Sequence, residues 1–159
     1  MRRTRKGGFT LIELLVVVAI IAIIATIAVI AYRAAIDRAR QKRSMADIRL
    51  IATAWEARAA DTRSYLVAGF TFPTAVTYEE LHGSLAPTYL RNIPRYDGWG
   101  RPFTFGAGPT ATEYGIRSAG RDGVYEGGTY SGGTTSSPDC DIVYGGGNFV
   151  QYPAVAQGD

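Results

Sequence analysis

The sequence predicts an α+β protein in which a long N-terminal α-helix packs on a small antiparallel β-sheet domain. The distribution of glycine and proline predicts this division. Residues 9–68 contain neither, whereas residues 69–159 hold 17 of the 19 glycines and all seven prolines. Because both residue types interrupt helices and mark turns, the first part of the chain is suited to one continuous helix. The second part is suited to short strands joined by turns.

Residues 9–32 are predicted to form a transmembrane helix. At 1.5 Å per residue, 24 helical residues span about 36 Å, more than the hydrocarbon core of about 30 Å. The segment is too long for the apolar part of a secretory signal peptide, which has about 7–15 residues. A plain membrane anchor does not explain its carboxylate, because a charge within a span is costly. Only three of the 24 residues are not apolar: Thr10, Glu13 and Thr26.

Residues 33–62 continue the helix as an amphipathic segment. Apolar side chains recur at steps of three and four, and charged side chains occupy much of the remaining surface. A helix over residues 9–60 would be about 78 Å long, which suits a filament subunit better than a soluble protein of this size. The apolar stripe predicted to pack on the domain contains Met45, Ile48, Ile51, Ala52, Trp55 and Ala59.

Residues 63–159 are predicted to form a globular β domain. Residues 103–105 and 113–118 alternate as two strands across a Gly-Pro turn. Two further strands are predicted at residues 141–144 and 148–151, on either side of three glycines. A short helix or turn is predicted at residues 78–81.

Composition narrows the function. A single histidine, His82, and a single cysteine, Cys140, exclude an internal disulfide and a zinc site made from these ligands alone. They also disfavour a hydrolase that depends on a catalytic histidine. Four of the 17 basic residues lie in positions 1–6, and without them 13 basic face 14 acidic side chains. We therefore expect no nucleic-acid partner.

A short basic stretch is followed by the segment Gly7-Gly8-Phe9-Thr10-Leu11-Ile12-Glu13. This segment resembles the class III signal of type IV prepilins and type II secretion pseudopilins. The resemblance implies that residues 1–8 are a leader. A membrane-bound prepilin peptidase would cut between Gly8 and Phe9 on the cytoplasmic side and then N-methylate Phe9. Glycine suits the cut because its backbone can enter a narrow active site. The resemblance, rather than the charges, sets the topology, because basic residues flank both ends of the span.

Glu13 has two interpretations. In the pilin-like reading, its carboxylate pairs with the Phe9 amine of a neighbouring subunit during assembly and neutralises both charges. In the alternative, the carboxylate simply reaches back to the membrane surface.

Three short segments of the globular half also carry the resemblance. Residues 61–65 are similar to the Asp-x-x-x-Tyr segment with which pseudopilins leave their helix. Residues 97–102 are similar to the Asp-x-Trp-Gly-x-Pro signature of the major pseudopilin, and Trp99 is expected to plug the core. Residues 118–123 are similar to the Ser-x-Gly-x-Asp-Gly loop of major pseudopilins, which Asp141-Ile142 would close.

In those proteins this loop holds Ca²⁺. The resemblance implies that Ser118, Asp122 and Asp141 are ligands in the loop 118–142, with Asp139 as a spare candidate. Calcium takes six to eight oxygen ligands, which a glycine-rich loop can supply partly from its backbone. The alternative is that Asp122-Gly123 is an ordinary turn and Asp139 a solvated loop residue.

The chain is therefore most similar to the major pseudopilin of type II secretion, which is not an enzyme. The resemblance implies a single-pass protein of the bacterial inner membrane with its globular domain in the periplasm. It would assemble into a homo-oligomeric periplasmic filament with minor pseudopilins and an inner-membrane assembly platform. A type IV pilin for adhesion, motility or DNA uptake is the alternative, although the lone cysteine cannot form the disulfide common in pilins. A membrane-anchored periplasmic enzyme would need a catalytic constellation that the sequence does not show.

Overall fold

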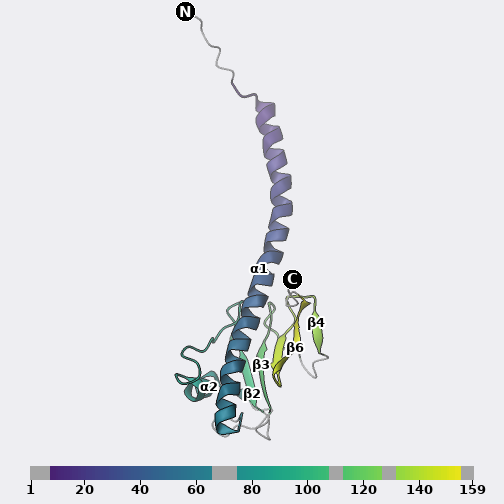
Figure 1. Ribbon diagram of the computed structural model, residues 1–159. Helices are drawn as coiled ribbons and strands as arrows, with labels where there is room; N and C mark the ends of the chain where they lie inside the picture. Colours follow the sequence, from purple (N-terminus) through teal and green to yellow (C-terminus); the bar gives the residue numbers. More distant parts are fainter. Residues whose placement is uncertain (1–7, 66–74, 108–112, 127–131, 155–159) are drawn as a thin grey trace, which may run out of the picture. The chain divides into compact units, whose positions relative to one another are not determined.

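The computed structural model describes residues 8–65, 75–107, 113–126 and 132–154. The chain divides into two units, Met1–Ile36 and Asp37–Asp159, and helix α1 (Leu11–Thr62) contributes to both (Figure 1). In the first unit, the helical residues up to Ala35 are exposed. Among the described residues, α1 is the one helix long and apolar enough to cross a membrane, as the sequence predicts.

The second unit is an α+β domain with one six-stranded sheet, in the order β1-β2-β3-β5-β6-β4 (Figure 1). The strands are β1 (Ala75–Val76), β2 (Thr104–Ala107), β3 (Tyr114–Ser118), β4 (Gly133–Thr135), β5 (Ile142–Gly145) and β6 (Asn148–Pro153). The predicted pairs β2–β3 and β5–β6 are confirmed, and each is antiparallel.

The sheet is not purely antiparallel, because β4 lies parallel to β6 at its edge. The reason lies in the connections. The chain reverses direction between β4 and β5 and again between β5 and β6. Strand β6 lies between β5 and β4 in the sheet. Strands β4 and β6 therefore run in the same direction. The sequence does not predict β4, because Gly133-Thr134-Thr135 contains no large apolar residue and therefore no apolar–polar alternation.

The core of the second unit lies between α1 and one face of the sheet. The predicted apolar stripe of α1 is buried throughout, and Ile48, Ile51 and Trp55 are fully buried. Strand β3 supplies alternate buried residues, as expected for a strand with one covered face. From the sheet, the core receives Val76, Phe105, Ala107, Tyr114, Ile116, Ile142 and Tyr144.

Helix α1 ends within the predicted segment 61–65. Arg63 adopts the left-handed conformation, with φ 57°, and turns the chain out of the helix. The indole Nε1 of Trp55 donates a hydrogen bond of 3.0 Å to the carbonyl of Tyr65. The Tyr65 ring stacks on Tyr114 of β3, with 4.8 Å between ring centroids. These contacts fix the chain leaving α1 against the sheet.

Helix α2 (Tyr78–Leu85) confirms the short helix predicted at residues 78–81 and extends it by four residues. Thr77 caps its N-terminus, and the Glu80 side chain accepts a hydrogen bond from the Thr77 backbone. This reciprocal pair is a capping box. Leu81 and Leu85 anchor the helix in the core.

Candidate functional site

The predicted cleavage position precedes α1. Gly8 and Phe9 lie outside the helix, and both are exposed. A Cβ atom placed on Gly8 would meet no atom within 4 Å, so the bond between the two residues is open to a peptidase. Gly7 and the basic residues before it lie outside the described residues. Cleavage and methylation therefore stay predictions.

Glu13 belongs to a capping box that was not predicted from the sequence. The Thr10 amide and hydroxyl donate to Oε2 of Glu13 at 2.8 and 2.7 Å, and the Glu13 amide donates to the Thr10 hydroxyl at 3.3 Å. The Thr-x-x-Glu spacing before an apolar run is the signal for this arrangement. Within a single chain, the carboxylate thus accepts from one backbone amide and one hydroxyl of Thr10 at the start of α1.

Asp97 organises the turn at residues 97–102. It is 2% exposed, and its Oδ1 accepts hydrogen bonds of 2.9 Å from the backbone amides of Trp99 and Arg101. Its Oδ2 accepts a 2.6 Å hydrogen bond from the hydroxyl of Ser118. One buried carboxylate therefore links this turn to the start of the predicted calcium loop. No role for Asp97 was predicted from the sequence, although a side chain that binds amides further along its own turn is common for aspartate.

The same turn rests on α1. The Gly98 amide donates to the buried hydroxyl of Ser44 at 2.8 Å. A Cβ on Gly98 would lie 2.3 Å from the carbonyl oxygen of Arg40, so only glycine permits this approach. Trp99 is half-buried and packs at the border of the core, with its Nε1 3.4 Å from Oδ1 of Asp37. The expectation that Trp99 plugs the core holds only in part, because its ring packs against the core but stays partly exposed.

Arg121 holds the loop to α1 through two carboxylates. Its guanidinium binds both oxygens of Asp139 at 2.8 Å and Oδ2 of Asp37 at 3.1 Å. The guanidinium lowers the pKa of Asp139 below its usual range through these hydrogen bonds and its charge. Arg101 donates to the carbonyl of Arg121 at 2.6 Å. Two arginines thus bind this part of the loop, and neither contact was predicted from the sequence.

The four residues implied as calcium ligands have different surroundings. Ser118 is buried, and its hydroxyl donates a hydrogen bond to Asp97. Asp139 forms an ion pair with Arg121. Asp122 is exposed, and its Oδ1 accepts a 3.0 Å hydrogen bond from the Val124 amide, as in an ordinary turn. Asp141 is fully buried. Asp122 and Asp141 therefore remain the two candidate carboxylates outside the Arg121 pair.

Glu126 lies beside Asp141. The backbone amide of Glu126 donates to Oδ2 of Asp141 at 3.1 Å. The Nε2 of Gln151 donates to Oε2 of Glu126 at 2.7 Å and to the Asp141 carbonyl at 3.2 Å. Burial and the charge of Glu126 raise the pKa of the Cys140 thiol, so this cysteine stays protonated at neutral pH. Over the residues that the structure describes, no three His, Cys, Asp or Glu side chains gather as a metal site. A calcium ion here would need backbone carbonyls as ligands.

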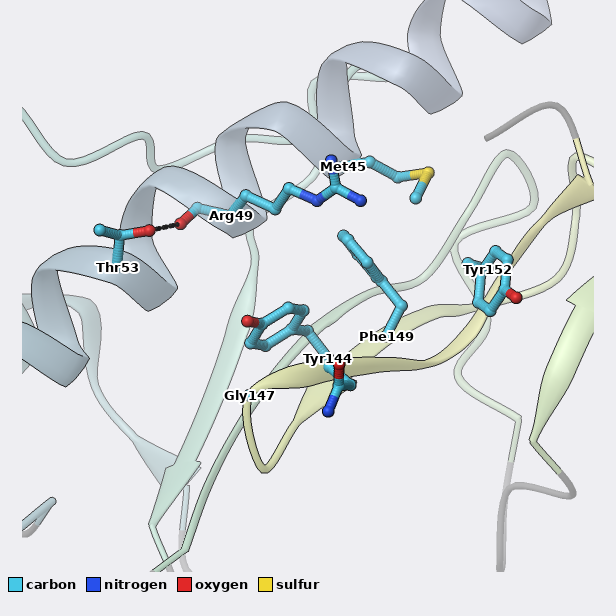
Figure 2. Close-up of a pocket in the computed structure, with 8 residues that line it drawn as sticks. Met45, Arg49, Thr53, Tyr144, Gly147, Phe149 and Tyr152 are labelled. Atoms are coloured by element: carbon cyan, nitrogen blue, oxygen red, sulfur yellow. Dashed lines mark hydrogen bonds between the residues drawn. The ribbon is translucent and has the colours of Figure 1, made fainter. Parts of the chain in front are cut away.

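A cavity of about 440 Å³ lies between α1 and the β5–β6 hairpin. Figure 2 shows Met45, Arg49 and Thr53 on the helix facing the aromatic side chains of the hairpin. The Arg49 guanidinium lies 5.1 Å from the centre of the Phe149 ring, and the Thr53 hydroxyl donates to the Arg49 carbonyl at 2.9 Å. The remaining lining residues are Tyr144, Gly147, Asn148 and Tyr152.

The described residues form an α+β protein in which Gly8 and Phe9 are exposed and α1 is long and apolar enough to cross a membrane. Comparison with protein families agrees with it. The family model for the prokaryotic N-terminal methylation motif matches residues 3–29. This match contains the predicted cleavage position and Glu13, and it marks a protein of the pilin-like class.

A second family model, for type II secretion system (T2SS) protein G, matches residues 31–136, more than half of the chain. The chain therefore belongs to the T2SS protein G family, whose members are structural pseudopilins. The expected pseudopilin identity is confirmed. The match includes Ser118 and Asp122 and ends before Asp139 and Asp141. No curated protein and no solved structure matches the chain significantly.

Proposed function

We propose that the chain is the subunit of a periplasmic pseudopilus that drives protein export by type II secretion. The protein G match over residues 31–136 carries this proposal. Prepilin peptidase would cut between Gly8 and Phe9 and methylate Phe9, and the inner-membrane assembly platform would add the subunit to a filament with minor pseudopilins. A type IV pilin is less well supported, because the match is to a secretion protein and Cys140 has no second cysteine with which to pair.

A deletion strain separates secretion from a pilus function. Loss of the subunit should leave exported proteins in the periplasm while surface pili, twitching and DNA uptake persist. Expression of the full chain should restore export. Normal export together with lost piliation would refute the secretion role and support the pilus alternative.

We further propose that the Glu13 charge acts in assembly by pairing with the Phe9 amine of a neighbouring subunit. The capping box offers a second reason for a carboxylate here, so the test must separate the two. Glu13→Gln keeps an oxygen that can accept from the Thr10 amide but removes the charge. Glu13→Ala removes both.

If charge pairing drives assembly, both variants should be processed and inserted, and both should fail to form filaments. If capping is the only role, Glu13→Gln should assemble like the wild type and Glu13→Ala should assemble poorly. Thr10→Ala is the matched control, because it weakens the cap and retains the charge.

We also propose that Ca²⁺ binds in the loop 118–142 through Asp122, Asp141 and backbone carbonyls. The support is a fully buried carboxylate at Asp141, since a buried charge is costly unless a cation or hydrogen bonds compensate it. Calcium would stabilise the fold in proportion to RT ln(1 + [L]/Kd). Asp139 stays outside the proposed set because Arg121 occupies both of its oxygens. The implied ligand Ser118 also stays outside it, because its hydroxyl donates to Asp97.

Thermal unfolding with millimolar calcium and with chelator tests this proposal. Calcium should raise Tm, and Asp122→Ala or Asp141→Ala should remove the difference. Asp47→Ala, an acidic change on α1 away from the loop, is the control and should keep it. Identical unfolding in calcium and chelator would leave Asp122-Gly123 as an ordinary turn.

A further inference from the structure

Four basic residues follow one another closely at the start of the second unit. Arg38, Arg40, Lys42 and Arg43, together called the basic segment, occupy six positions of α1, and all four are exposed. Successive helical residues are turned by about 100°, so their side chains leave the helix in several directions. Such an arrangement suits an anionic environment that surrounds a helix rather than a partner protein on one side.

The described residues provide little compensation for these charges. Asp47 lies 3.6 Å from Arg43. The nearby Asp37 is already bound by Arg121. The described part of the structure shows no ion pair for Arg38, Arg40 or Lys42. Arg38 and Lys42 are also four positions apart, where like charges destabilise an isolated helix. The segment therefore concentrates positive charge, of which the described residues of the domain pair only Arg43.

The sequence places this charge close to a membrane surface. The apolar run ends at Tyr32, and the basic segment begins six residues later in the same helix. Six helical residues extend about 9 Å. The headgroup layer on each side of a bilayer is about 5–8 Å thick, and the field of anionic lipids reaches roughly a further 8 Å at physiological salt. Arg38 and Arg40 fall within that range for an anchored subunit, and Lys42 and Arg43 lie near its outer limit, about 15–17 Å beyond Tyr32.

We propose that the basic segment binds the headgroups of anionic phospholipids around the anchored subunit. Each Lys or Arg near such a surface adds about fivefold in affinity, about 1 kcal/mol. The bound lipids would hold the subunit at a defined depth, and they would have to be released when it enters a filament. The inference rests on membrane anchoring alone and holds for either a secretion or a pilus filament.

Electron spin resonance of the full chain in phosphatidylcholine vesicles tests the proposal. Spin-labelled phosphatidylglycerol or phosphatidylcholine is added in trace amounts, and the fraction of motionally restricted label gives their relative association with the protein. We expect phosphatidylglycerol to be preferred at least about fivefold at low salt. The preference should fall toward one at about 0.5 M salt, where the Debye length is on the order of 4 Å.

The double variant Arg38→Gln/Lys42→Gln should lose most of the preference. The matched double variant Arg63→Gln/Arg91→Gln removes two exposed charges elsewhere in the second unit and should retain it. Two results would overturn the proposal. One is an equal motionally restricted fraction of both labelled lipids with the unaltered protein. The other is an equal loss of the phosphatidylglycerol preference in both double variants. The salt titration needs no substitution, so the test remains decisive if a variant fails to fold.

Discussion

Replacing the buried Asp97 carboxylate should strongly destabilise the second unit, because several groups depend on this one side chain. Asp97→Ala removes the acceptor of three hydrogen bonds, from two backbone amides and the Ser118 hydroxyl. A buried donor left without a partner costs about 1–3 kcal/mol. Because the vacated site allows some water to enter, we expect a total loss of about 3–5 kcal/mol.

Thermal and denaturant unfolding of residues 37–159, the unit that contains the core, measures this loss. The expected decrease in Tm is roughly 10–20 °C for a unit of this size. Asp97→Asn keeps one oxygen for the backbone amides and should lose less. Ser118→Ala removes one of the three bonds and should cost about 1–2 kcal/mol. A loss below about 1 kcal/mol for Asp97→Ala would refute the view that this carboxylate organises the turn.

Three further predictions follow from the packing and the charges. Gly98→Ala should lower the free energy of unfolding by about 1–3 kcal/mol, measured with denaturant, because its Cβ meets the Arg40 carbonyl. Gly83→Ala is the control: its Cβ enters open space, and it should stabilise α2 by about 0.5–1 kcal/mol. Ile48→Ala should cost about 2–5 kcal/mol because the side chain is fully buried, and a cost under about 1 kcal/mol would place Ile48 outside the core. Arg121→Gln should destabilise at neutral pH. Arg121 depresses the folded-state pKa of Asp139, so the stability that this pair contributes is present above the ordinary pKa near 4 and is lost as pH falls through the lower folded value. The difference in denaturant midpoint between wild type and variant should therefore shrink on acidification, and a constant difference from about pH 7 to about pH 2 would contradict the ion pair.

The helical half of the chain could be predicted from local patterns. Helix α1 and its buried stripe follow from the absence of glycine and proline and from the spacing of Ile48, Ala52 and Trp55. These signals act within a few residues and do not depend on distant segments. The strands β2, β3, β5 and β6 carry the same kind of local alternation or lie beside glycine turns, and they are predictable for that reason.

The contacts of the loop could not be predicted in this way. Asp97 and Ser118 are 21 positions apart, and Arg121 reaches Asp37 across 84 positions. Only the folded domain, with α1 and the turns packed together, brings these groups close to one another. The sequence therefore indicates which polar residues mark the loop but not which of them bind one another. The Thr10–Glu13 capping box is different, because its spacing is a local signal that the sequence does contain.

The mass of the mature subunit tests the central claim most directly. The filament fraction sheared from cells should contain a chain that starts at Phe9 and carries one methyl group on its amine, as the methylation-motif match at residues 3–29 leads us to expect. Intact-mass and N-terminal peptide spectrometry measure both features on the same sample. A chain that retains Met1 in assembled filaments, or a processed chain that is found only as a membrane-bound monomer, would contradict the claim that this protein is a processed filament subunit.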